Sequence, residues 1–350
     1  MLELINTLKQ RIPTIWVTKT IIASNLLVFL AMLASGAGFW HSASDIQLLW
    51  GANFGPATQD GQWWRLATAM FLHFGAMHLL LNMWSLWDAG QFVERMYGRL
   101  RFASIYLVSG LGGNLLSLVM HGNSAISGGA SGAVFGVYGA LLVYLFIERS
   151  TINIKEFRWL FWGAFAFSVI SIAMGFIVTG IDNAAHVGGF VAGCLTSISL
   201  INLPVGRQTY YVSHRLFSVS ALVIVALILI IYIPAPKYRW SDELLLRKEI
   251  GEFSAQDQAI NRSWLEIVND GKSGDVSVNA LAEDIDSSIV RQYEKSFEKL
   301  SALPDNSALP SSGELKQALQ YVKQKKLASQ LLANQIRSQS QDQTGQLKTQ

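Results

Sequence analysis

Seven charge-poor apolar segments, separated by short polar loops, dominate the first two thirds of this sequence. They lie at roughly 20–35, 71–90, 102–120, 131–147, 159–179, 184–203 and 216–233. A helix needs about 20 apolar residues to cross the hydrocarbon core of a bilayer, and several of these segments approach that length. In lipid, backbone polar groups must be satisfied internally, which a helix achieves within one segment. The pattern predicts an all-α, polytopic membrane bundle of seven transmembrane helices.

The charged residues are distributed unevenly along the 350-residue chain. The first 239 residues hold 8 of the 24 Asp and Glu residues and 14 of the 27 Lys and Arg residues, and the rest of the chain holds the other 16 and 13. The division predicts an N-terminal segment over 1–19, a membrane domain over 20–233 and a soluble helical domain over 234–336. The Ser- and Gln-rich end, 337–350, is expected to be disordered.

Lys and Arg residues collect in alternate loops of the membrane domain. The N-terminal segment and the loops after the second, fourth and sixth apolar segments are basic, whereas the other loops hold a single basic residue, Arg65. The positive-inside rule then places the N-terminus in the cytoplasm of a cell-membrane protein that contacts lipids. With seven spans, the chain after residue 233 emerges on the opposite side. The net charge of +3 is too small and scattered to indicate a nucleic-acid partner.

The C-terminal part has a helical pattern. Helices are predicted over 243–253, 255–268, 275–303 with breaks, and 314–336, and Ser311-Ser312-Gly313-Glu314 has the form of a capping box for the last one. This part contains neither His nor Cys, and the chain has no His-Glu-x-x-His, nucleotide or phosphate motif. We therefore expect no metal and no cofactor.

A single hydroxyl stands among glycines and alanines at the start of the fourth apolar segment, in Gly128-Gly129-Ala130-Ser131-Gly132-Ala133. Small residues let membrane helices pack closely, and taken alone this stretch indicates a packing face. Other polar residues change that interpretation: His78 and Asn82 lie near the start of the second segment, and His186 lies near the start of the sixth. In the predicted topology these residues share one depth, where polar groups are costly unless they face one another or a wet cavity.

Each of these polar residues also has a structural interpretation. His78 and Asn82 can join helices by hydrogen bonds, and His186 can be a core histidine satisfied by its neighbours. A non-catalytic multi-pass protein, such as a transporter or a membrane-protein assembly factor, would use the residues in this way. Transporters often show discontinuous helices at matching positions of two halves, and no such pairing is visible here.

The chemical alternative is a serine hydrolase with two catalytic members. A serine hydroxyl such as that of Ser131 is a weak nucleophile until a base takes its proton, and His186 is suited to that role near neutral pH. His78 and Asn82 are four residues apart and share one helix face. Both can donate to the oxyanion of a tetrahedral intermediate, with the backbone N–H of Ser131 as a third donor.

The positions of nearby residues in the sequence indicate which roles they can have beside Ser131 and His186. Asp182 precedes His186 in a loop, so no acid is convincingly placed to orient the imidazole, and Phe135, one turn after Ser131, can hold it by stacking instead. His73 lies on a different side of the helix from His78 and is expected to be structural. Gly189 and Gly193 have the spacing that lets the sixth helix pack closely on the fourth.

Five ordered motifs resemble the rhomboid family of intramembrane serine proteases, over about residues 60–200. They are Trp64-Arg65, His73-Phe74-x-x-Met77-His78-x-x-x-Asn82, Gly90-x-x-x-Glu94-x-x-x-Gly98, Gly129-x-Ser131-Gly132 and Ala185-His186-x-x-Gly189-x-x-x-Gly193. The resemblance implies a Ser131–His186 dyad, an oxyanion site of His78, Asn82 and the Ser131 amide, and cleavage of substrate transmembrane helices near their outer ends. Many members have Tyr in place of Phe135. The seventh span resembles that of members with one extra C-terminal helix.

Overall fold

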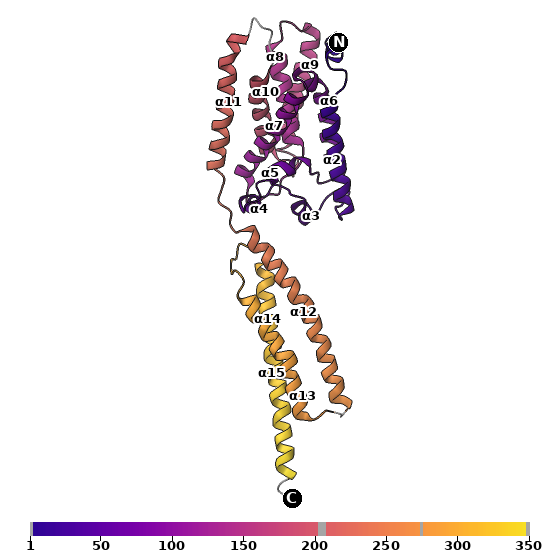
Figure 1. Ribbon diagram of the computed structural model, residues 1–350, viewed down its shortest axis with the longest axis vertical. Helices are drawn as coiled ribbons and strands as arrows, with labels where there is room; N and C mark the ends of the chain where they lie inside the picture. The colour runs from indigo at the N-terminus through magenta and orange to yellow at the C-terminus, as the bar shows by residue number, and fades with distance from the viewer. Residues whose placement is uncertain (1–2, 202–207, 274–275, 348–350) are drawn as a thin grey trace. The chain divides into compact units, whose positions relative to one another are not determined.

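The computed structural model describes residues 3–201, 208–273 and 276–347, and most of them are helical (Figure 1). Among these residues the single extended pairing is an isolated bridge between Asn53 and Ser127. The predicted all-α class is confirmed. The chain forms two compact units, Met1–Pro236 and Lys237–Gln350.

The N-terminal unit is a bundle in which one long helix corresponds to each predicted apolar segment. A short helix, α1 (Glu3–Arg11), precedes them. The long helices are α2 (Trp16–Ala34), α6 (Ala76–Tyr97), α7 (Arg99–His121), α8 (Ser131–Ile147), α9 (Ile154–Met174), α10 (Asn183–Leu200) and α11 (Gln208–Ile231).

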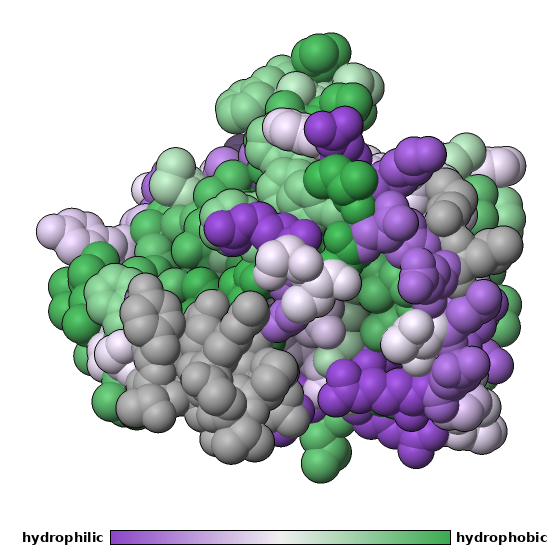
Figure 2. Space-filling view, turned by 90° about the horizontal axis from the view of Figure 1, so that it is seen from above, coloured by the Kyte–Doolittle hydropathy of each residue, from purple (hydrophilic) through white to green (hydrophobic). Residues whose placement is uncertain are grey.

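Four of the described helices are long and apolar enough to cross a membrane, namely α2, α7, α9 and the Val212–Ile231 part of α11. A fifth candidate is the bent pair formed by 65–71 and α6, which meet at 91°. Helix α8 is apolar but has only 17 residues. The count of seven spans therefore stays a prediction. Figure 2 looks onto the end of this unit that carries the N-terminus, where hydrophilic side chains cover much of one side and hydrophobic ones gather on the other.

The second long helix begins later than predicted. Instead of a helix from residue 71, the chain forms α5 (Arg65–Thr68) and η1 (Ala69–Phe71), then turns before α6. The backbone of the turn bonds to a preceding segment: the N–H of Ser42 donates to the carbonyl of Phe74, and that of Ala76 donates to the carbonyl of Phe39, both at 2.9 Å. A continuous helix would need these groups for its own ladder, so the tertiary contact ends it.

The loop between α2 and α5 is folded onto the bundle and includes α3 (Ser44–Leu49) and α4 (Gly55–Gln59). Arg65 binds this loop and is itself buried, with only 4% of its surface exposed. One terminal nitrogen of its guanidinium donates to the carbonyls of Leu48 at 2.8 Å and Ala52 at 3.0 Å. Arg65 therefore has a structural role in this loop.

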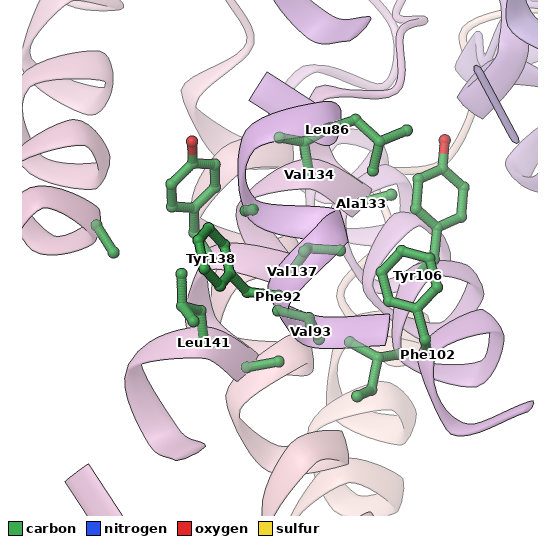
Figure 3. Close-up of a cluster of buried hydrophobic side chains, with 14 of the residues drawn as sticks. Leu86, Phe92, Val93, Phe102, Tyr106, Ala133, Val134, Val137, Tyr138 and Leu141 are labelled. Carbon is green, nitrogen blue, oxygen red and sulfur yellow. The ribbon is translucent and has the colours of Figure 1, made fainter. Parts of the chain in front are cut away.

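Helix α8 lies at the centre of the bundle, with 12 of its 17 residues buried. Figure 3 shows its side chains among those of α6 and α7: Ala133, Val134 and Val137 lie with Leu86, Val93, Phe102 and Tyr106. Because α8 begins at Ser131, this packing fixes the position of the serine at the end of a rigid element.

Glycines bring α8 and α10 into backbone contact. A Cβ atom added to Gly189 would lie 1.9 Å from the carbonyl oxygen of Gly132, and one added to Gly193 would lie 2.3 Å from the Cα of Gly136. No side chain fits at such distances, so glycine is required at the crossing. The predicted close packing of the sixth helix on the fourth is confirmed.

The C-terminal unit is helical, as predicted, but its boundaries differ. Its elements are α12 (Trp240–Ser273), α13 (Val278–Asp284), the π-helical η3 (Ile285–Val290), α14 (Arg291–Ser301) and α15 (Ser312–Leu347). Two corrections follow. Helix α12 runs through residue 254, where a break was expected, and α15 extends beyond residue 336, where the predicted last helix ended. The disorder of 337–350 stays a prediction. Helix extension is cooperative and Gln, Lys and Leu are good helix formers, which favours continuation; residues 348–350 lie outside the described ones.

The predicted capping box at the start of α15 does not form. The hydroxyl of Ser311 donates to Oε1 of Glu243 at 2.7 Å, and the N–H of Ser311 donates to Oε2 of Glu243 at 3.1 Å. Glu243 is fully buried on α12. The acceptor is thus a glutamate 68 residues away, in place of the local Glu314.

Candidate active site

Ser131 is the first residue of α8 and is half-buried. The segment before it is held at two points. Asn53 and Ser127 exchange two backbone hydrogen bonds of 2.8 Å, and the N–H of Gly129 donates to the carbonyl of Ala69 at 2.8 Å. Because these bonds fix the chain on both sides of Gly128, the start of α8 and its serine are held by the loop that folds over the bundle.

Gly129 allows His78 to lie against this segment. Its φ angle is +136°, which side-chain-bearing residues rarely adopt, and an added Cβ would lie 2.8 Å from both Nε2 and Cε1 of His78. A side chain at position 129 would displace the imidazole. The glycine of the Gly129-x-Ser131 motif therefore brings the ring of α6 close to the start of α8.

His186 lies in the first turn of α10 and is 7% exposed. Its ring stacks on that of Phe135, with centroids 4.2 Å apart and planes at 15°. Phe135 is one helical turn beyond Ser131, and an added Cβ at Gly132 would lie 3.1 Å from the carbonyl oxygen of Ala185. The stacked ring and the close backbones bring the imidazole to the end of α8 that carries Ser131.

The structure describes no hydrogen bond between Ser131 and His186 in the part of the chain that it covers, and the buried Nδ1 of His186 has no partner there. Hydrogen bonds of a catalytic base are often long in an enzyme without substrate and shorten in the complex. The geometry brings Ser131 and His186 to the same end of α8, and no other described side chain forms a hydrogen bond with the imidazole.

His78 and Asn82 lie on successive turns of α6. The side-chain amide of Asn82 donates to the carbonyl of His78 at 2.9 Å, which uses one of its two N–H groups. The ring of His78 packs edge-on against His73, with centroids 5.1 Å apart. His73 is fully buried, and neither of its nitrogens has a partner among the described residues.

The carboxylate of Asp182 forms no hydrogen bond with the imidazole of His186 in the described structure; the two residues are joined by a backbone bond, from the N–H of His186 to the carbonyl of Asp182 at 3.1 Å. It precedes α10, and its Oδ1 accepts from the N–H of Ala185 at 2.9 Å, which makes it the N-cap of that helix. Its Oδ2 accepts from the hydroxyls of Ser117 and Ser127. The sequence analysis did not single out either serine. The one available signal was the Asp182 side chain, in a position typical of an N-cap.

Within 3–201, 208–273 and 276–347, no group of three or more His, Cys, Asp and Glu side chains is arranged to hold a metal ion.

Comparison with known proteins adds to this geometry. Residues 60–203 match the family described as the rhomboid domain. The chain is 36% identical to "Rhomboid protease GluP" of Bacillus subtilis (strain 168) over 184 residues, which cover 52% of this chain but only 34% of that protein. The chain thus spans about a third of that relative's length.

Two further relatives are covered over most of their length. The chain is 30% identical to "Rhomboid protease AarA" of Providencia stuartii over 209 residues, 53% of this chain and 73% of that protein. It is 31% identical to "RHOMBOID-like protein 6, mitochondrial" of Arabidopsis thaliana over 228 residues, 56% of this chain and 73% of that protein. Together with the helices that can cross a membrane, these matches establish that the chain is a multi-pass membrane protein of the rhomboid family.

Proposed function

We propose that this protein is an intramembrane serine endopeptidase in which Ser131 is the nucleophile and His186 the general base and acid. The observation that carries the proposal is the stack of Phe135 on His186, at 4.2 Å, which holds the imidazole beside the helix end that begins with Ser131. Family membership gives the proposal its reaction class. The packed glycines of α8 and α10 give it a rigid frame.

The first half of the proposed reaction forms an acyl-enzyme. The hydroxyl oxygen of Ser131 attacks the carbonyl carbon of the substrate peptide bond while its proton passes to His186. The tetrahedral intermediate collapses when the imidazolium gives that proton to the leaving amine. The C-terminal fragment departs, and the N-terminal fragment stays bound to Ser131 as an ester.

The second half releases the enzyme. A water molecule attacks the ester carbonyl while His186 takes its proton. The bond between the acyl carbon and the oxygen of Ser131 then breaks, that oxygen takes the proton from His186, and the N-terminal fragment leaves as a carboxylic acid. In both halves the negative oxygen requires donors, for which we propose His78, Asn82 and the N–H of Ser131. The first N–H groups of a helix have no partner within the helix, so the start of α8 is suited to an anion.

A cavity indicates how a substrate helix reaches the dyad. It has a volume of about 500 Å³ and is lined by side chains of α6, α8 and α9, among them Trp84, Tyr138 and Phe167. The ring of Phe167 stacks on Tyr138 at 4.2 Å and lies 6.1 Å from Phe135, which stacks on His186. We propose that substrates enter between α6 and α9, because only four of the 21 residues of α9 are buried.

The proposed substrates are the transmembrane helices of other membrane proteins. A peptide bond in a helix is hidden by internal hydrogen bonds that are costly to break in lipid. Segments with Gly or Pro near the cleaved bond unwind more readily and should be preferred. The crowding at Ser131, where an added Cβ at Gly129 would contact His78, favours a small residue such as Ala before the cut.

The proposed placement follows the basic loops. The N-terminus lies in the cytoplasm, seven spans cross the cell membrane, and the C-terminal unit lies on the other side. In this topology Ser131 lies in the outer half of the bilayer, so cleavage occurs near the outer ends of substrate helices.

A fluorophosphonate probe tests the chemistry. Detergent-solubilised protein should be labelled at Ser131, and Ser131→Ala or His186→Ala should abolish cleavage of a transmembrane reporter while the protein still inserts. Ser104→Ala is a matched control, because its exposed hydroxyl bonds only to the carbonyl of Leu100 on its own helix. Robust cleavage by Ser131→Ala protein would overturn the assignment of Ser131 as the nucleophile, whereas a wild type that neither labels nor cleaves would favour the non-catalytic alternative.

The acid limb of the pH profile gives an independent check. A general base must be neutral to accept a proton, so activity should fall on acidification as His186 becomes protonated. Probe labelling of Ser131 should fall with it. A loss of reporter cleavage with undiminished labelling would assign the pH effect to substrate binding instead.

A panel of reporter helices tests the substrate class. The members differ only in Gly and Pro content and in the size of the residue before the cut. Equal cleavage of a poly-Leu helix with a bulky residue there would overturn the substrate proposal and leave the dyad untouched.

A further inference from the structure

The two segments that carry the candidate dyad are joined by a third group. Ser127 precedes Ser131 by four residues, and Asp182 precedes His186 by four. The hydroxyl of Ser127 donates to Oδ2 of Asp182 at 2.6 Å. One hydrogen bond thus links the chain leading to the nucleophile with the chain leading to the base.

The same carboxylate makes two more bonds. Its Oδ2 also accepts from the hydroxyl of Ser117 on α7, at 2.5 Å, and its Oδ1 accepts from the N–H of Ala185 at 2.9 Å. O–H donors to a carboxylate are among the shorter and stronger hydrogen bonds of proteins. The carboxylate is therefore hydrogen-bonded to three parts of the bundle: α7, the segment before α8 and the start of α10.

The position of Asp182 suits a residue that joins several segments. It lies at the N-terminus of α10, where the helix dipole favours a negative charge. The Nε2 of His121 lies 4.0 Å from Oδ1, and the side chain of Asp182 is 21% exposed. Both serine donors are buried, so little water competes for the two hydroxyl bonds.

We propose that Asp182 is a positioning residue for the dyad: its carboxylate fixes the segment that ends in Ser131 against the helix start that carries His186. The inference rests on the proposed protease function. Asp182 acts through the backbone, because it has no hydrogen bond to the imidazole in the described structure, and it is therefore distinct from the third member of a catalytic triad.

The expected consequence is a loss of turnover with little loss of binding. Misplacement of a reacting group by about 1 Å can reduce a rate about 100-fold. Asp182→Ala should lower kcat about 10- to 100-fold and change KM less than about two-fold, since no atom of Asp182 is proposed to contact substrate. Ser127→Ala removes one of the three bonds and should lower kcat by a smaller factor. Asp182→Asn keeps a side-chain acceptor for the helix cap and should restore part of the loss.

The test uses full-length protein in proteoliposomes. Active sites are counted by fluorophosphonate labelling, and kcat and KM for a transmembrane reporter are expressed per labelled site. The double variant Asp182→Ala/Ser127→Ala should be no slower than Asp182→Ala alone, because both substitutions break the same bond. Ser104→Ala on α7 is the control and should match the wild type.

A merely structural role gives a different result. Destabilisation alone lowers the number of labelled sites but leaves kcat per site unchanged, and that outcome for Asp182→Ala overturns the proposal. If Asp182→Ala does not fold, Ser127→Ala decides in the same way. Failure of the wild type to label at Ser131 overturns the protease function itself and this inference with it, whereas normal labelling with unaffected variants overturns this inference alone.

Discussion

The two units of this protein differ in how some of their buried polar side chains are hydrogen-bonded. In the C-terminal unit the fully buried carboxylate of Glu243 accepts from Ser311 and Arg247, and Asp257 accepts from the hydroxyls of Tyr293 and Tyr321. In the N-terminal unit the nitrogens of His73 and the Nδ1 of His186 are buried without a partner among the described residues. Both histidines lie at the candidate site, since the ring of His73 packs against that of His78 and the ring of His186 stacks on that of Phe135.

The helices of the two units are also held together differently. Helices α8 and α10 meet through backbone contact at glycines, whereas Gly251 in the middle of α12 has no atom within 4 Å of an added Cβ. Membrane helices gain nothing from the hydrophobic effect in lipid and depend on close packing. A helix in water gains from burying an apolar face and tolerates an open glycine. Four predictions test this contrast, from the largest expected effect to the smallest.

The largest effect is expected at the glycine crossing. Gly193→Leu should abolish reporter cleavage, because its side chain would collide with Gly136 and separate α10, with His186, from α8. Gly251→Leu is the matched control: it meets no atom, and leucine favours a helix more than glycine does, by up to about 1 kcal/mol. Activity in both variants, measured per folded protein, checks the pair. Full activity of Gly193→Leu would contradict the importance of close packing.

The second prediction concerns the proposed oxyanion donors. Asn82→Ala and His78→Ala should each reduce turnover about 10²- to 10³-fold, the usual loss for one such donor, without blocking probe labelling of Ser131 altogether. His73→Ala should act mainly on stability. A His73→Ala protein that is stable but inactive, beside an active His78→Ala protein, would show that the two histidine roles are reversed.

The third prediction moves to the C-terminal unit. Glu243→Ala leaves the buried N–H and hydroxyl of Ser311 without their acceptor, which should reduce the free energy of unfolding of this unit by about 1–3 kcal/mol. Hydrogen exchange of α12 and α15 measures the loss. Reporter cleavage should be unchanged, and Glu266→Ala, an exposed change on the same helix, is the control. A parallel loss of cleavage would show that the two units are coupled.

The smallest effect is expected at surface ion pairs. The Nζ of Lys299 lies 2.5 Å from Oε2 of Glu249 and 2.7 Å from Oε2 of Glu252. Its hydrogen bond to Glu252 lowers the pKa of that carboxyl group. A carboxylate whose folded pKa is depressed adds stability above its unfolded pKa, and that stability is lost as the pH falls through the folded value. The contribution is small because the group is exposed and screened by salt.

The stability that this ion pair contributes is also lost at alkaline pH. The pKa of Lys299 is raised, first by its hydrogen bond to Glu249, so its contribution is present below the unfolded pKa and lost as the pH rises through the folded value. Hydrogen exchange of α14 from acidic to alkaline pH, with and without high salt, checks both the acid and the alkaline limb. Lys299→Gln should remove the salt dependence, and a large pH effect in that variant would point to another group.

Features that depend on residues close together in the sequence were predicted, and features that depend on distant residues were not. Apolar runs, the spacing of Gly189 and Gly193, and the ring one turn after Ser131 are local patterns, and each led to a structural feature that is present. Helix periodicity alone places Phe135 on the turn after Ser131, and the stack on His186 follows once two helices touch.

Other features depend on partners that no local pattern contains. The late start of α6 follows from backbone bonds to residues 39–42, and the capping box fails because Ser311 bonds to a glutamate 68 residues away. The bonds of Asp182 span 65 residues to Ser117 and 55 to Ser127.

The sequence by itself therefore determined the helical class and the glycine crossing, because each follows from residues one or a few turns apart, and the Ser131–His186 dyad stays a prediction. The tertiary structure alone decided where α6 begins and which carboxylate accepts from which hydroxyl. A hydrogen bond between distant residues requires chain segments to be brought together first, and only the packed bundle determines which donors then face which acceptors.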